Sequence, residues 1–141
     1  MYLNFIGLAA ATATFLGIWT GHVLVRKMEY RSTSLILPTI CFALVGLFLG
    51  FCSFLSISPT TSAVLGILSM TALWDSYEFS RQQKRVVKGY APANPQNPRH
   101  ARILEKHKSA ITLDLLKRDP IGREVNAEEA VRLIVAKAKT R

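Results

Sequence analysis

Charged side chains are almost absent from the first half of this 141-residue chain. Residues 1–74 carry three basic side chains and one acidic side chain, whereas residues 75–141 carry fifteen and eight. A soluble globule needs polar and charged groups over its whole surface, so this uneven chain is excluded from that class. Cysteine is equally scarce, because Cys41 and Cys52 are the only two, and this excludes a small secreted domain held together by disulfides.

Sequence motifs for catalysis are also lacking. The chain has no phosphate-binding loop, no dinucleotide-binding glycine motif and no nucleophile elbow. His100 and His107 stand seven residues apart with Glu105 as the only close acid, so we expect both histidines to be solvated. The sequence therefore predicts a protein that is not an enzyme and that has no cofactor and no metal ion.

Long apolar runs dominate what is present. Three of them, at about 3–25, 34–57 and 62–79, reach or approach the length of about 20 residues that a helix needs to cross a bilayer. Three such runs in the first 80 residues leave too little polar chain to cover them in water. We therefore predict an all-α fold in which residues 1–88 form a three-helix transmembrane bundle.

The loops between these runs predict an orientation. The loop 26–33 carries Arg26, Lys27 and Arg31, whereas the loop 58–61 has no charge. The positive-inside rule then places the first loop and the long tail in the cytoplasm and the N-terminus outside. We expect the basic residues that follow the third span to face anionic lipid headgroups. These residues are Arg81, Lys84, Arg85 and Lys88.

Small residues recur at four-residue spacing in the predicted spans and form faces on which helices can approach closely. They are Ala9, Ala13, Gly17, Gly21, Gly46, Gly50, Ser62 and Gly66. We interpret these faces as packing surfaces within one bundle. The alternative is that one of them mediates homo-oligomerisation.

Polar and ionisable side chains gather at the predicted cytoplasmic end of the first and third spans, at helical spacings that put each set on one face. They are His22, Arg26, Glu29, Asp75, Glu78, Gln82 and Arg85. If the two helices are neighbours, Arg26 can pair with Glu78 or with Asp75. Glu29 can then pair with Arg85.

Two interpretations of this polar cluster remain open. One is an interface that fixes the depth and register of the helices. The other is a proton- or ion-handling site that uses His22, Asp75 and Glu78. Aromatic residues at the same level are typical of a belt at the membrane surface and favour the first interpretation. They are Trp19, Tyr30, Trp74 and Tyr77.

Two stretches of the chain resemble the motifs of a known family. Residues 22–30 resemble a His-Pro-x-x-x-Lys-x-Glu-Tyr motif. Residues 73–95 resemble a block that reads Leu-Trp-Ser-x-x-Glu, then Gln, Arg-Val and Lys-Gly-Trp-x-Pro-x-Asn-Pro. Val23, Asp75 and Tyr90 replace the proline, the serine and the second tryptophan of these motifs, and Asp75 thus adds a carboxylate in place of a hydroxyl.

Both motifs are similar to those of an uncharacterised bacterial family of small integral membrane proteins, a domain of unknown function. The resemblance covers residues 3–97. It implies a small helical bundle in the bacterial cytoplasmic (inner) membrane, and it implies no known activity.

The remaining segment reads as a linker followed by a helical tail. Residues 89–99 are rich in proline and asparagine and predict an extended linker or a strap across the inner face of the bundle. Residues 100–141 predict a basic cytoplasmic tail of about two amphipathic helices, one over about 100–117 and one that starts after Asn126. Residues 81–141 carry fifteen basic and six acidic side chains, which favours contact with anionic lipid.

These features together predict a non-catalytic accessory or scaffold subunit of a membrane complex, whose tail docks a membrane or cytoplasmic protein. The alternative is a small oligomeric transporter or a proton- or ion-conducting protein. Binding of nucleic acid by the basic tail is a third possibility that we do not favour, because the tail shows no RNA-binding signature with paired aromatic residues.

Overall fold

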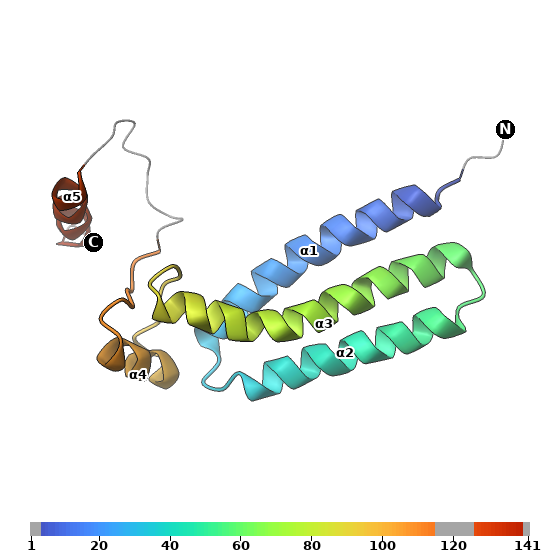
Figure 1. Ribbon diagram of the computed structural model, residues 1–141, viewed down its shortest axis with the longest axis horizontal. Helices are drawn as coiled ribbons and strands as arrows, with labels where there is room; N and C mark the ends of the chain where they lie inside the picture. Colours follow the sequence, from blue (N-terminus) through green and yellow to red (C-terminus); the bar gives the residue numbers. More distant parts are fainter. Residues whose placement is uncertain (1–3, 115–125, 140–141) are drawn as a thin grey trace.

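The computed structural model describes residues 4–114 and 126–139, and these residues form five α-helices and no strand. The all-α class that the sequence predicts is therefore confirmed. Figure 1 shows three long helices side by side and two short helices near one end of them. The helices are α1 (Ile6–Arg31), α2 (Ile36–Leu55), α3 (Pro59–Val87), α4 (Pro98–Lys106) and α5 (Ala127–Lys139).

The third helix is the centre of the arrangement. α3 packs against α2 along most of its length and against α1 over its second half, while α1 and α2 share few contacts. In Figure 1, α1 diverges from α3 toward its own N-terminus. The ends of α1 and α3 and the start of α2 lie together at the end where α4 is found.

Local sequence signals explain where α3 begins and ends. At its start, Pro59 occupies the first helical turn, and the Ser58 hydroxyl accepts a hydrogen bond from the Thr61 backbone N–H at 3.4 Å. At its end, Gly89 adopts a positive φ of 77°, and Tyr90 donates its N–H to the Arg85 carbonyl at 2.8 Å. This is a Schellman cap, which turns the chain sharply out of the helix.

Two of the helices, α1 and α2, are long and apolar enough to cross a membrane. The structure thus shows two such helices and not the three that the sequence predicts, because polar residues at the start of α3 and the carboxylate of Asp75 lower the hydropathy of α3. The helices also extend beyond the predicted spans. α1 continues to Arg31 and α3 to Val87, so both carry charged turns past their apolar segments.

The chain after α3 folds back on the end of the bundle. Residues 88–111, which we call the cap, contribute Ala91, Ala93 and Ile103 to a small core against Val86 of α3. The Ala93 N–H donates to the Ile111 carbonyl at 2.8 Å, and the Ser109 hydroxyl donates to the Val87 carbonyl at 2.7 Å. Residues 89–99, which contain the prolines, are therefore ordered against the end of the bundle, and we call them the strap.

The boundaries in the tail differ from those that the sequence predicts. α4 begins inside the expected linker, because Asn97 and Pro98 together cap and start a helix. It ends at Lys106, well before residue 117, and residues 115–117 lie outside the described part of the chain. α5 starts where the sequence predicts, with the Asn126 side-chain oxygen accepting from the Glu129 N–H at 2.8 Å.

Candidate functional site

The most completely paired polar cluster surrounds Glu29, whose residue is only 1% exposed. One carboxylate oxygen, Oε1, lies 2.9 Å from Nη1 of Arg99 and 3.0 Å from Nε2 of His100. Both partners come from α4, about 70 residues further along the chain. A carboxylate buried this deeply is stabilised only when it is paired and hydrogen-bonded, and the cap supplies both interactions.

His100 is fully buried and links α4 to the strap. Its Nδ1 atom accepts a hydrogen bond from the Asn94 backbone N–H at 2.8 Å. Nδ1 therefore carries no hydrogen, and Nε2–H is the donor to Glu29. The ring also meets Tyr30 edge-on, with 6.1 Å between the ring centroids. The expectation that His100 is solvated was wrong, because the return of the strap buries it completely.

Two asparagines and one arginine of the cap close the end of α1. Asn94 and Asn97 donate from their side-chain amides to the Tyr30 carbonyl at 3.3 and 3.2 Å, and Asn97 also donates to the Ser32 carbonyl at 2.9 Å. Arg99 donates to the Ser32 carbonyl and to the Glu29 carbonyl. These carbonyls belong to the last turn and C-cap of α1, so the cap satisfies acceptors that lie beyond the intrahelical ladder.

We call this set the clamp: Glu29, Asn94, Asn97, Arg99 and His100. Local folding explains its geometry. The Asn97 side chain accepts from the Arg99 N–H at 3.0 Å, and Pro98 fixes the first turn of α4. The helix start thereby sets the direction in which Arg99 and His100 leave the backbone. Sequence reasoning missed the three cap residues Asn94, Asn97 and Arg99, although the Asn-Pro pair before an Ile-Leu face was a readable helix start.

A second carboxylate, Glu78, is buried on α3 and is paired within its own helix. Its Oε1 lies 3.0 Å from Nη1 of Arg85, and its Oε2 lies 3.6 Å from Nε of Arg81. The same Nη1 donates to Oε1 of Gln82 at 3.1 Å. Among the described residues, Oε1 of Glu78 has no hydrogen-bond donor of suitable geometry, so its pairing is chiefly electrostatic.

These contacts correct the expected pairings. Glu29 binds Arg99 and His100 instead of Arg85. Arg26 is exposed, and within the described chain it makes no ion pair with Glu78 or with Asp75. The physical reason is that the cap folds back against the end of α1, so that Arg99 and His100 lie beside Glu29. Glu78 pairs instead with Arg81 and Arg85, which follow it by one and two turns on α3.

The helical face expected on α1 is also corrected. The buried residues of α1 are Ala13, Gly17, Gly21, Val25 and Glu29, whereas His22 and Arg26 are exposed. Steps of four residues advance 400°, so this contact line moves about 40° around α1 at each step. His22 and Glu29 are seven residues apart and so lie on similar sides of α1, but only Glu29 is buried, whereas His22 stays exposed at the edge of the contact.

Asp75 has a different environment from the other two carboxylates. Its residue is 5% exposed, and it packs against Gly21, where a Cβ atom would collide with the carboxylate. Within residues 4–114 and 126–139, Asp75 makes no hydrogen bond and no ion pair. It lines a cleft of about 380 Å³ between α1 and α3 together with His22, Thr71 and Trp74.

The small residues of the sequence analysis lie largely at contacts within the chain. An added Cβ at Gly17 would be 3.2 Å from the Thr71 hydroxyl, and one at Gly46 would be 2.7 Å from Leu73. The Ser69 hydroxyl donates to the Gly46 carbonyl at 2.7 Å, which joins α3 to α2. Gly50 faces Ser69, and Gly66 faces Ser53. The Ser62 hydroxyl donates to the Ser53 carbonyl. On α1, Ala13 is buried and Ala9 is half-buried.

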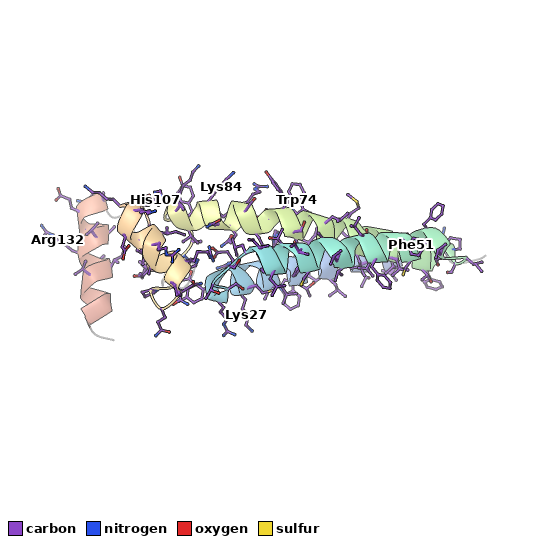
Figure 2. The ribbon with its side chains drawn as sticks, turned by 90° about the horizontal axis from the view of Figure 1, so that it is seen from below. Lys27, Phe51, Trp74, Lys84, His107 and Arg132 are labelled. Carbon is purple, nitrogen blue, oxygen red and sulfur yellow. The ribbon has the colours of Figure 1, made fainter. Side chains whose placement is uncertain are left out.

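Aromatic and basic side chains surround the same end of the helices. Trp74 and Tyr77 meet edge-on at 5.7 Å, and the Arg81 guanidinium lies 5.9 Å from the Trp74 ring. Figure 2 shows Lys27 and Lys84 toward the α4 end, Phe51 toward the opposite end and Trp74 between them. The remaining residues of these two groups, Trp19, Tyr30, Arg85 and Lys88, are also exposed.

The described residues offer little for metal or nucleophile chemistry. No group of three His, Cys, Asp or Glu side chains that could hold a metal ion is found among them. Cys41 and Cys52 are free thiols on α2, at an exposed and a half-buried position. The arrangement around Glu29 joins α1 to the cap and closes the end of α1.

Comparison with known proteins shows a match to a family model. No curated protein and no solved structure matches the chain. The family model described as Domain of unknown function (DUF4491) matches residues 4–97, about two thirds of the chain. The matched region contains the three long helices and the strap through Asn97, and it ends just before Arg99 and His100. On this match, the chain belongs to the DUF4491 family of proteins with a domain of unknown function.

Proposed function

We propose that this protein is a non-catalytic, multi-pass protein of the bacterial inner membrane that serves as an accessory or scaffold subunit of a membrane complex. In this proposal α1, α2 and α3 span the bilayer, and the cap is a fixed cytoplasmic platform that docks a protein partner. The observation that carries the proposal is the clamp. In the clamp, the buried carboxylate of Glu29 binds Arg99 and His100 and so fixes the cap on the end of the bundle.

The exposed apolar surface supports membrane residence. Only 22% of the apolar window of α1 and 11% of that of α2 are buried, whereas core helices of a soluble protein are mostly covered. Phe54 and Ile57, near the far end of α2, are 87% and 100% exposed. Large apolar side chains exposed over whole helices are favourable only against lipid or another protein.

The path of the chain supports a third crossing. α3 returns alongside α2 to the end where α1 stops, and residues 59–74 of α3 contain no charge. Sixteen helical residues extend about 24 Å, which covers most of a hydrocarbon core about 30 Å thick. If α1 and α2 cross the bilayer, an α3 that packs between them crosses it as well.

The distribution of charge supports an orientation with the cap inside. Arg26, Lys27 and Arg31 of α1 lie at the α4 end, as do the basic residues of the last turns of α3. The loop between α2 and α3, residues 56–58, carries no charge. The positive-inside rule therefore favours a cytoplasmic cap and an external N-terminus.

Docking of a partner is supported by α5. Val131, Leu133 and Val135 on this helix are 60%, 41% and 51% exposed, and its first turn carries Glu128 and Glu129. A short helix with uncovered apolar residues is suited to a groove on another protein.

Purification of the tagged full chain from native membranes in mild detergent, after chemical cross-linking, tests this proposal. We expect a stoichiometric partner that is lost in Val131→Asp and retained in Arg132→Ala, an exposed neighbour on the same helix. A homogeneous homo-oligomer without any second protein in the wild type would contradict an accessory role.

One observation favours a second candidate function, a small oligomeric transporter or ion-conducting protein. Asp75 is buried without a direct partner among the described residues, beside the cleft that His22 also lines. Intramembrane carboxylates often mark ion pathways. Flux of protons or cations into liposomes, lost in Asp75→Asn and in Glu78→Gln, would support this candidate, and flux equal to that of empty liposomes would remove it.

A further inference from the structure

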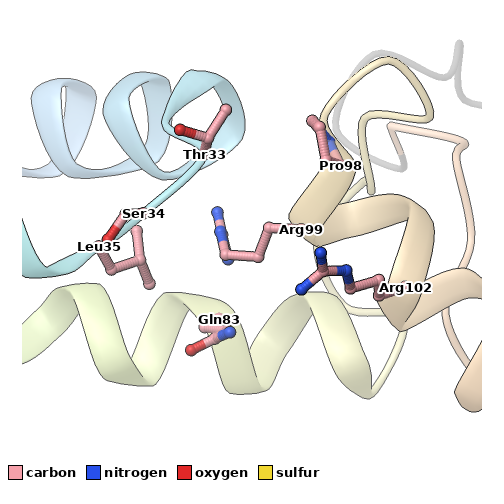
Figure 3. Close-up of a pocket in the computed structure, with 7 residues that line it drawn as sticks. All are labelled: Thr33, Ser34, Leu35, Gln83, Pro98, Arg99 and Arg102. Carbon is pink, nitrogen blue, oxygen red and sulfur yellow. The ribbon is translucent and has the colours of Figure 1, made fainter.

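We propose that the cleft between the start of α2, the second half of α3 and α4 binds the phosphate of an anionic phospholipid. The proposal rests on the membrane placement given above. The cleft has a volume of about 480 Å³. Figure 3 shows two guanidinium groups and one side-chain amide directed into it. Its polar lining is Thr33, Ser34, Gln83, Arg99 and Arg102.

Arg102 supplies the uncompensated positive charge. It is exposed on α4, and within the described chain it makes no ion pair and no hydrogen bond. Arg99 is different, because Glu29 neutralises it and three of its hydrogens are already donated. One hydrogen on each terminal nitrogen of Arg99 remains for a ligand. The planar guanidinium groups of Arg102 and Arg99 can thus both donate to phosphate oxygens, Arg102 with all of its hydrogens and Arg99 with the two that remain.

The rest of the lining adds donors around the same space. Thr33 and Ser34 bring hydroxyl groups from the loop after α1, and Gln83 brings an amide from α3. α2 begins next to them at Ile36, and its N-cap residue Leu35 has no capping side chain. The Ser34 hydroxyl accepts from the Ile36 N–H at 3.3 Å, and the first turn of α2 has no acidic residue. The positive end of the α2 dipole therefore adds to the attraction for an anion in this cleft.

A lipid, rather than a soluble phosphate, is favoured by what adjoins the cleft. Leu35 lines it, and Ile36 and Leu37 continue from its edge with exposed fractions of 71% and 70%. An exposed apolar helix surface thus begins where the phosphate-binding groups end. A molecule with a phosphate joined to hydrocarbon chains fills both regions, with its headgroup at the cap and its acyl chains along α2.

Native mass spectrometry of the detergent-solubilised full chain, titrated with phosphatidylglycerol or phosphatidylcholine, tests this site. We expect one phosphatidylglycerol to bind more tightly than phosphatidylcholine. Arg102→Ala is expected to weaken that binding about tenfold or more. Lys106→Ala removes the same charge from the last turn of α4, outside the cleft, and is expected to change the affinity less than twofold.

Three outcomes would overturn the inference. These are equal affinity for the two lipids, equal loss in the two variants, and displacement of the bound lipid by millimolar inorganic phosphate, which would assign the site to a free anion. Alkaline carbonate extraction of the same protein from vesicles separates this failure from that of the proposed function. Release into the wash contradicts membrane anchoring, whereas retention with equal lipid binding by both variants removes only the lipid site.

Discussion

Replacing Glu29 with alanine is expected to release the cap from the bundle. The change leaves His100, which is fully buried, and Arg99, whose side chain is 13% exposed, without their shared acceptor. Loss of one partner of a buried pair costs about 3–5 kcal/mol. Because Arg99 retains its bond to the Ser32 carbonyl and some contact with water, we take the lower end, about 3 kcal/mol.

This loss can be measured by hydrogen–deuterium exchange of the protein in lipid nanodiscs. The informative amides are those of Ala93, Ala101 and His107, which are hydrogen-bonded within the cap. About 3 kcal/mol corresponds to local opening that is roughly 100-fold more frequent, and these amides should exchange faster by that factor. Amides in the middle of α2 should keep their wild-type rates.

Two further variants sharpen the result. Glu29→Gln keeps an oxygen that can accept from both donors but removes the charge, so exchange should rise about tenfold. Glu105→Ala removes an exposed carboxylate from α4 itself and should leave the rates nearly unchanged. If Glu29→Ala raised exchange in the cap no more than Glu105→Ala, the clamp would not be what holds the cap, and the reasoning would be refuted.

Two glycine substitutions give further predictions. Gly21→Ala places a Cβ against the Asp75 carboxylate and should lower the free energy of unfolding by about 1–3 kcal/mol, more than alanine gains in helix propensity. Gly7→Ala, where the added Cβ meets open space, should be neutral or slightly stabilising. Thermal unfolding of both variants in detergent measures the difference. Gly89→Ala forces a side chain onto a positive φ and against the Ser109 carbonyl, so exchange across the cap should rise while α1 and α2 melt as before, and unchanged cap exchange would contradict the Schellman turn.

The apolar runs and the breaks between them were predictable from the sequence because hydropathy and helix punctuation are local properties. The ends of α1 and α3 were less so, since their last turns are held by groups distant in sequence, such as Asn97 on the Tyr30 carbonyl. The partners of Glu29 could not be read from helical spacing. Spacing fixes the direction of a side chain on its own helix, but the return path of the strap decides which residue arrives there.

His100 illustrates the same limit. A histidine in a basic, proline-rich tail usually faces water, and only the contact between α4 and the end of α1 buries it. Asp75 shows the reverse case. The sequence placed it in a polar cluster with potential partners nearby, yet the structure sets it against Gly21, where the absence of a Cβ atom leaves room for the carboxylate.

Membrane topology is the central claim, and cysteine accessibility tests it most directly. In a background where Cys41 and Cys52 are replaced by alanine, single substitutions Thr33→Cys, Ser58→Cys and Lys106→Cys report on both ends of the bundle. The account predicts that an impermeant maleimide labels the Ser58 position in intact cells, and the other two positions only after the cells are permeabilised. Labelling of the Ser58 and Lys106 positions from the same side of the membrane would contradict a crossing by α3 and, with it, the platform that the clamp is proposed to hold.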